Sequence, residues 1–126
     1  MKATELRIGN LIEINERVEP VVSIDNYCIN YTVNRVGSHA IKQFHQIDRV
    51  KPILITKEWL FKFGFVQQYW NFFPMTYYRK GNILYSLSDG NIELHKPNTY
   101  LTQLKYVHEL QNIFFALTGE ELTPLN

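Results

Sequence analysis

Short runs of alternating apolar and polar residues fill the first half of the chain and constrain its fold more than any other feature. Residues 6–14, 18–25 and 27–33 show this alternation, and residues 40–47 show it less regularly. Because successive side chains on a strand point to opposite faces, each run predicts a strand with one buried face. Pro20 cannot donate to a strand ladder, so we expect the second strand to start late or to lie at an edge. Four short strands joined by tight turns predict an antiparallel, barrel-like (SH3-like) sheet.

The second half of the chain opens with a helix signal and continues with turn signals. Thr56 is placed to cap a short helix over residues 57–63. Residues 65–96 then predict a β-meander, with hairpin turns at residues 80–82 and 89–90. The second of these is an Asp-Gly pair, which is the strongest hairpin signal in the chain because a type I′ turn needs positive φ.

An apolar stripe near the C-terminus is the most regular pattern in the sequence. Its members recur at the spacing of three and four that marks one helix face: Leu104, Val107, Leu110, Phe114 and Leu117. We expect a long amphipathic helix that starts at Asn98 or Thr99 and ends near Leu117. The predicted class is therefore α+β, with one subdomain over residues 1–54 and a helix–meander–helix subdomain over residues 55–126. A single compact domain is the alternative.

Charge and cysteine content exclude several classes of protein. The net charge is +1, with seven basic and six acidic residues in residues 1–55 and six of each in residues 56–126. Neither half shows the basic footprint of a duplex nucleic-acid binder. Cys28 is the single cysteine and no secretory signal is found, so we expect a cytoplasmic protein. No apolar run approaches the roughly 20 residues of a membrane span, so we expect no membrane partner.

No constellation of residues predicts catalysis or a cofactor. The closest histidines, His39 and His45, lie six residues apart and lack the tight spacing of zinc ligands. Cys28 is most simply interpreted as an ordinary half-buried thiol. The sequence contains neither a Gly-x-Ser-x-Gly elbow nor a glycine-rich phosphate loop. We predict no enzyme activity, no catalytic or metal-binding residue, no cofactor and no small-molecule ligand.

Aromatic residues are concentrated in one short segment. Ten of them lie within residues 59–78: Trp59, Phe61, Phe63, Phe65, Tyr69, Trp70, Phe72, Phe73, Tyr77 and Tyr78. A contiguous exposed aromatic patch marks a protein–protein contact. Aromatic residues also dominate ordinary cores, so a core that is packed on two sides explains the same segment. Under the first interpretation we expect Trp59, Tyr69, Trp70 and Phe72 to contact a partner.

Polar residues border the apolar stripe of the predicted C-terminal helix. His108, Gln111 and Asn112 lie beside it at helical spacing. One interpretation is a recognition or dimer face, in which His108 can change charge near neutral pH. The other is that these side chains bond to strand ends and orient the helix.

A weakly basic segment offers an alternative function. Residues 31–51 contain a single acidic residue and four basic ones, Arg35, Lys42, Arg49 and Lys51. The aromatic residues Tyr31 and Phe44 lie in the same segment. On a small barrel, such a segment supplies cations for phosphates and rings for bases. The competing interpretation is a solvated hairpin whose charges protect a sheet edge.

Three stretches of the sequence carry a family resemblance. They are residues 6–10 (LRIGN), residues 56–65 (TKEWLFKFGF) and residues 106–122, which begin YVHELQN and end FFALTGEEL. Together they resemble a family of short uncharacterised proteins of gut Bacteroides-type bacteria and their prophages. The resemblance spans the start, middle and end of the chain. It implies a cytosolic protein of mobile-element context, and it carries no activity or catalytic residue with it.

The combined prediction is a non-enzymatic binding or accessory protein. It would present aromatic and polar surface to another protein or to a second copy of itself as a homodimer. The alternative is a small nucleic-acid-binding module that uses the segment from Arg35 to Lys51.

Overall fold

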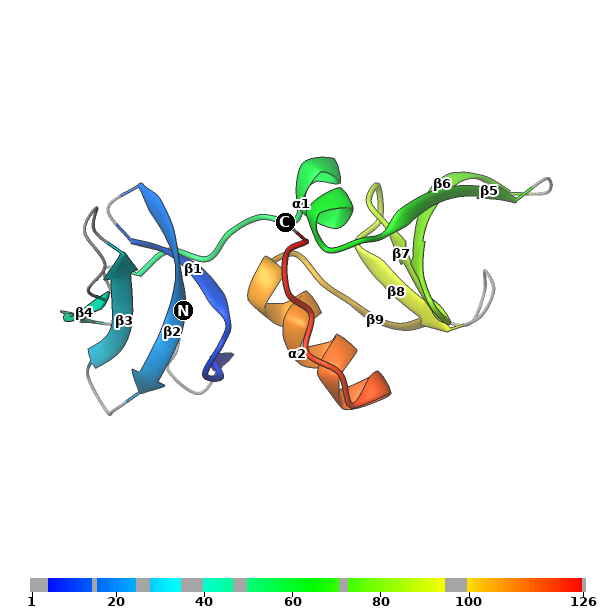
Figure 1. Cartoon of the computed structure of the whole chain (residues 1–126). Helices are drawn as coiled ribbons and strands as arrows, with labels where there is room; N and C mark the ends of the chain where they lie inside the picture. Colours follow the sequence, from blue (N-terminus) through cyan, green and yellow to red (C-terminus); the bar gives the residue numbers. More distant parts are fainter. Residues whose placement is uncertain are drawn as a thin grey trace. The chain divides into compact units, whose positions relative to one another are not determined.

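The computed structural model describes residues 5–14, 16–24, 28–34, 40–46, 50–70, 73–94 and 100–125. These ranges contain nine strands and two helices, which confirms the predicted α+β class (Figure 1). The chain divides into two compact units. The first unit comprises Met1–Ile53 with Tyr106–Asn112, and the second comprises Leu54–Lys105 with Ile113–Asn126.

The sheet of the first unit is a four-stranded antiparallel meander. Its strands, in spatial and chain order, are β1 (Leu11–Ile14), β2 (Arg17–Ile24), β3 (Cys28–Asn34) and β4 (Ala40–Gln46). Four strands are therefore present where alternation predicted them, but the first begins at Leu11 rather than at residue 6, because residues 6–10 form no strand. The described pairings do not close this sheet into a barrel, so the SH3-like closure that we predicted is unconfirmed.

Strand β2 pairs with different neighbours along its two halves, and this explains how it contains a proline. Residues 17–20 pair with β1, whereas Val21, Ser23 and Ile24 pair with β3. Both backbone groups of Val21 bond toward the β1 side, to Asn10 and Gly9, so the nitrogen of the preceding Pro20 faces the opposite side, where pairing with β3 begins only at Val21. The missing N–H of Pro20 therefore interrupts neither ladder. The expectation that this strand lies at an edge or starts late is wrong, because β2 is an interior strand that begins three residues before Pro20.

The core of the first unit lies under β1 and β2. The buried side chains are Leu6, Ile12, Ile14, Val21 and Val50, with Ile24 packed against them. The outer edge of β1 is covered by the chain itself, since the backbones of Glu13 and Lys51 exchange two hydrogen bonds of 2.9 Å.

The second unit is a short helix followed by a five-stranded antiparallel meander. Its elements are α1 (Lys57–Lys62), β5 (Val66–Trp70), β6 (Phe73–Lys80), β7 (Ile83–Ser86), β8 (Asn91–Leu94) and β9 (Tyr100–Gln103). Thr56 caps α1 as predicted, because its hydroxyl accepts from the Trp59 backbone N–H at 3.3 Å. Ser86 pairs with Asn91, so the turn between β7 and β8 contains four residues and is not the two-residue type I′ turn that the Asp-Gly pair predicted. Gly90 has a φ of +74°, whereas Asp89 does not have a positive φ.

The C-terminal helix α2 (Val107–Thr118) is shorter than predicted. Tyr100–Gln103, which we assigned to the helix, form β9 and pair with β8. The helix starts later because Glu109 accepts a 2.9 Å bond from the Tyr106 backbone N–H, one half of a capping box. Its end agrees with the prediction, since Gly119 follows with a φ of +75°.

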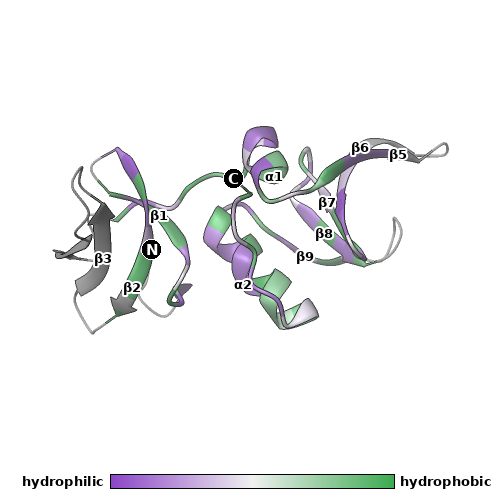
Figure 2. Ribbon diagram, viewed as in Figure 1, coloured by the Kyte–Doolittle hydropathy of each residue, from purple (hydrophilic) through white to green (hydrophobic). Residues whose placement is uncertain are grey.

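Hydropathy is mixed along both helices. Figure 2 shows hydrophilic and hydrophobic residues alternating along α2. Val107, Leu110 and Phe114 are its buried apolar residues. Within the ranges that the structure describes, neither helix is long and apolar enough to cross a membrane.

Candidate functional site

The aromatic segment of the second unit has both buried and exposed members. Phe63, Phe65, Tyr77 and Tyr78 are buried, and Phe65 packs edge-on against Phe114 with ring centroids 6.3 Å apart. The burial of these four residues agrees with the interpretation of the aromatic segment as part of the core.

Tyr69 belongs to the exposed members of the aromatic segment. Its side chain is 72% exposed, the largest value among the exposed large apolar side chains of the described chain. The Tyr69 hydroxyl accepts a 2.6 Å bond from the side chain of Gln67, which holds the phenol over the strand surface. The register between β5 and β6 shifts at this point, between Gln68 and Trp70. Such an irregularity changes the direction in which a side chain points from the strand.

Strands β5 and β6 extend beyond the rest of their sheet, and we call this part the aromatic arm. The arm comprises β5 and residues 73–76 of β6. Val66, Gln67 and Gln68 pair with β6 residues that also pair with β7, so the part that extends past β7 is Tyr69 and Trp70 with residues 73–76. Figure 1 shows both strands running past β7. Among the predicted partner residues, Phe72 and the side chain of Trp70 lie outside what the structure describes.

Trp59, the remaining aromatic candidate, lies on α1. It is partly buried, its ring centroid lies 5.6 Å from that of Phe63, and Lys62 Nζ lies 4.7 Å from its centroid. These contacts anchor Trp59 to its own helix and to the core of the second unit.

In the first unit, Gln111 is engaged inside the protein rather than presented at a surface. It is 2% exposed. Its side-chain oxygen accepts from the Leu11 backbone N–H at 2.8 Å, and its amide nitrogen donates to the Gly9 carbonyl at 3.4 Å. The Leu11 N–H lies at the start of the edge strand β1, so Gln111 satisfies a donor that would otherwise be orphaned.

Asn112 extends the same network. Its side-chain oxygen accepts from Arg7 Nε and from the Asn10 side chain, both at 2.8 Å, and its amide donates to the Glu5 carbonyl at 2.9 Å. The contacts of Gln111 and Asn112 are those of side chains that orient a helix on strand ends. They also join the LRIGN stretch to the HELQN stretch, which the sequence separates by about a hundred residues.

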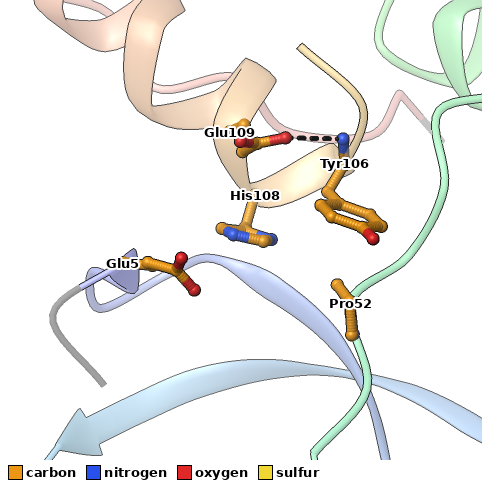
Figure 3. A pocket seen from close by; sticks show the side chains of 5 residues that line it. All are labelled: Glu5, Pro52, Tyr106, His108 and Glu109. Carbon is orange, nitrogen blue, oxygen red and sulfur yellow. Dashed lines mark hydrogen bonds between the residues drawn. The ribbon is translucent and has the colours of Figure 1, made fainter. Parts of the chain in front are cut away.

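His108 lines a small polar pocket in the first unit, which the sequence did not indicate. The other lining residues are Glu5, Pro52, Tyr106 and Glu109, and the pocket has a volume of about 170 Å³. Figure 3 shows that the imidazole extends from the first turn of α2 and lies between the Glu5 carboxylate and the Tyr106 ring. The rings of Tyr106 and His108 are nearly parallel, with an interplanar angle of 9° and centroids 5.8 Å apart.

The imidazole of His108 is buried without a hydrogen bond at Nδ1. Its side chain is 2% exposed, and Nδ1 has no partner. Burial lowers the pKa of His108 from its ordinary value, against the opposing effect of the Glu109 and Glu5 carboxylates. The ring is therefore neutral at pH 7, with one nitrogen able to accept a hydrogen bond.

The basic segment of the alternative function falls largely outside the described residues. Arg35 and Arg49 lie outside them, and so does the side chain of Lys42, although its backbone belongs to β4. Lys51 is exposed, and its backbone pairs with Glu13.

No group of three or more His, Cys, Asp or Glu side chains in the described chain is arranged to hold a metal ion. No protein family, no curated protein and no solved structure matches this chain.

Proposed function

We propose that this chain is a non-enzymatic binding protein that associates with a second copy of itself through the aromatic arm. The observation that carries the proposal is the 72% exposure of Tyr69 on an edge strand. A tyrosine contributes a large, rigid contact area with a polar tip, which is why such residues are enriched at protein interfaces.

The construction of the arm supports the same conclusion. A two-stranded hairpin is marginally stable in water, and a third strand or another cover stabilises it. Among residues 73–76, Phe73 pairs with Trp70 of β5, and none of the four pairs with another described strand. Strand β5 has the sequence VQQYW, without the lysine, aspartate, glutamate or proline that commonly protects an edge. Val66, at its start, is exposed as well.

Other parts of the proposal rest on the sequence. The absence of a catalytic motif supports a protein without enzyme activity. A single cysteine supports a cytoplasmic location. The family resemblance supports an origin in a prophage or other mobile element.

Light scattering after size exclusion tests the proposal over a range of protein concentrations. The test variant is Tyr69→Ala. The matched control is Tyr100→Ala, because Tyr100 is also an exposed tyrosine, at 57%, on β9 at the opposite edge of the same sheet. Far-ultraviolet circular dichroism establishes that both variants are folded.

The expected result is a wild-type dimer, a dimeric Tyr100→Ala variant and a folded monomeric Tyr69→Ala variant. A wild type that stays monomeric at every concentration refutes self-association. A dimer that is lost with Tyr100→Ala and kept with Tyr69→Ala places the contact on the other edge and refutes the role of the arm.

A further inference from the structure

Strand β5 is the outermost strand of the described part of the second sheet. It pairs there on one side only, with β6 (Figure 1). The backbone N–H and C=O groups on the other side of such a strand are a template for a further strand. Peptides add to sheet edges in this way, with affinity from main-chain hydrogen bonds. The sequence of β5 limits which strand can be added.

The edge that β5 offers carries no charge. The strand consists of Val66, Gln67, Gln68, Tyr69 and Trp70, none of which is ionised at pH 7. Directly opposite side chains of like charge destabilise a strand pair, and opposite charges stabilise it. Two copies of β5 therefore meet without repulsion, whereas a charged strand of another protein finds no opposite charge in β5. A second copy of β5 is the occupant that this edge fits.

Two-fold symmetry determines the direction of such a pair. Most oligomers of identical chains are closed, and a two-fold axis is the commonest arrangement. An axis perpendicular to the joined sheet reverses the strand and keeps every side chain on its own face, so the pair is antiparallel. Pairing of β5 with β9, the other edge of the sheet, is heterologous and leaves both ends open to further copies.

The length of β5 determines the register. Side chains on one face of a strand have the same parity, so in a symmetric pair one residue lies opposite its own copy. If that residue is Gln68, all five residues of β5 pair. If it is Gln67 or Tyr69, three of the five pair. The register centred on Gln68 therefore forms the most backbone hydrogen bonds.

The side chains agree with this register. It places Gln67 of each copy opposite Tyr69 of the other copy. Directly opposite side chains have Cβ atoms about 4.5–5.5 Å apart and interact. Within its own strand, Gln67 donates a 2.6 Å bond to the Tyr69 hydroxyl, so these two side chains are of kinds that bond to each other. The 72% exposed phenol of Tyr69 also gains a neighbour against which it packs.

We propose that two copies of the chain join by antiparallel pairing of β5 with β5, in the register centred on Gln68. The two five-stranded meanders then form one continuous sheet. This inference rests on the proposed self-association through the aromatic arm, and it specifies the strand, the direction and the register of the contact.

Disulfide cross-linking of the full chain tests the register. Every variant also carries Cys28→Ser, so that the introduced thiol is the only one in the chain. Residues directly opposite in an antiparallel pair have Cα atoms about 4.5–5.5 Å apart. That separation lies within the range of about 4.4–6.8 Å that a disulfide spans. Gln68→Cys is expected to form a covalent dimer in a glutathione redox buffer, detected by electrophoresis without reductant.

Gln67→Cys is the matched control, because Gln67 is the same residue type at the neighbouring position and is also partly buried. In the proposed register its own copy lies diagonally across the junction, at roughly 7–8 Å. A disulfide does not span more than about 7 Å between Cα atoms without backbone movement. The covalent dimer is therefore expected to form at least about tenfold more slowly in Gln67→Cys than in Gln68→Cys.

Charge substitution tests the register independently of disulfide chemistry. Gln68→Glu places two carboxylates opposite each other, whereas Gln67→Glu places each carboxylate opposite the uncharged Tyr69. Because like charges directly opposite destabilise a strand pair, Gln68→Glu is expected to raise the dimer dissociation constant about fivefold more than Gln67→Glu.

Light scattering of the parent Cys28→Ser chain separates this inference from the proposed function. A monomer at every concentration overturns both. A dimer that depends on Tyr69 but cross-links through Gln67→Cys as fast as through Gln68→Cys, or through neither, keeps the proposed function and overturns the register. Equal weakening by the two glutamate substitutions also overturns the register.

Discussion

Replacement of Gln111 by methionine tests how α2 is fixed to the first sheet. Gln111→Met keeps the length and approximate volume of the side chain but removes its acceptor and its donor. The Leu11 backbone N–H, bonded at 2.8 Å, then loses its acceptor inside the protein. The Gly9 carbonyl loses a longer bond of 3.4 Å, whereas the Asn10 amide keeps its bond to Asn112 at 2.8 Å.

The magnitude follows from these losses. An orphaned buried backbone donor costs about 1–3 kcal/mol, and a long neutral bond contributes less than about 1 kcal/mol. The Gln111 side chain no longer has its own amide to desolvate, which offsets part of the loss. We expect Gln111→Met to lower the free energy of unfolding of the first unit by about 2 kcal/mol.

Native-state hydrogen exchange measures this loss of unfolding free energy at the Leu11 amide itself. The Leu11 amide is expected to exchange about thirtyfold faster in the variant, since 1.4 kcal/mol corresponds to a factor of ten. Gln103→Met is the matched control, because Gln103 is exposed and makes one 3.5 Å side-chain contact, with the Asp89 carbonyl. Leu11 exchange that is unchanged by Gln111→Met refutes the assignment of Gln111 as the acceptor that holds the edge of β1.

Two further predictions concern His108 and Gly90. Because burial lowers the pKa of His108, the unfolded chain binds more protons than the folded chain below about pH 6.5, so stability falls as pH decreases through that value. Urea unfolding at several pH values is expected to show this fall in the wild type and a smaller one in His108→Leu, and identical slopes would contradict it. Gly90→Ala is expected to destabilise the second unit by more than about 2 kcal/mol, because an added Cβ lies 2.7 Å from the Leu104 carbonyl oxygen at a φ of +74°. Thermal unfolding checks this, and an unchanged midpoint would show that the turn relaxes; Gly81→Ala, with no atom within 4 Å of the added Cβ and a φ of +60°, is the control for the dihedral cost alone.

Local patterns predicted the strands well because a period of two depends on a few neighbouring residues. Strands β2, β3 and β4 and the two-residue turn at Gly81 follow directly from alternation and turn chemistry. Strand β1 begins at Leu11 rather than at residue 6, and the Asp-Gly pair ends a four-residue loop. Pro20 misled the prediction of an edge position, because the pairing partner of β2 changes at that residue.

The start of α2 was missed because two patterns overlap. Leu104 continues the helical spacing of Val107 and Leu110, so the stripe extends into residues that belong to no helix. Tyr100–Gln103 instead complete the sheet by pairing with β8, a contact that periodicity does not reveal. Tyr106 is not a residue type that marks a helix cap, so nothing in the sequence indicated that Glu109 accepts from its N–H.

The candidate sites depend on contacts between distant parts of the chain. His108, Gln111 and Asn112 were predicted as a polar stripe, but their roles depend on Glu5, Arg7 and Asn10, about a hundred residues earlier. Sequence spacing gives a helix face and no information on which strand end lies against it.

Hydrogen exchange of β5 at low and high protein concentration tests the central claim, self-association through the aromatic arm, most directly. If the arm is the contact, backbone amides of Val66–Trp70 exchange more slowly as the concentration rises, while those of β9 do not change. Exchange in β5 that is independent of concentration, in a sample that light scattering shows to be dimeric, contradicts the account.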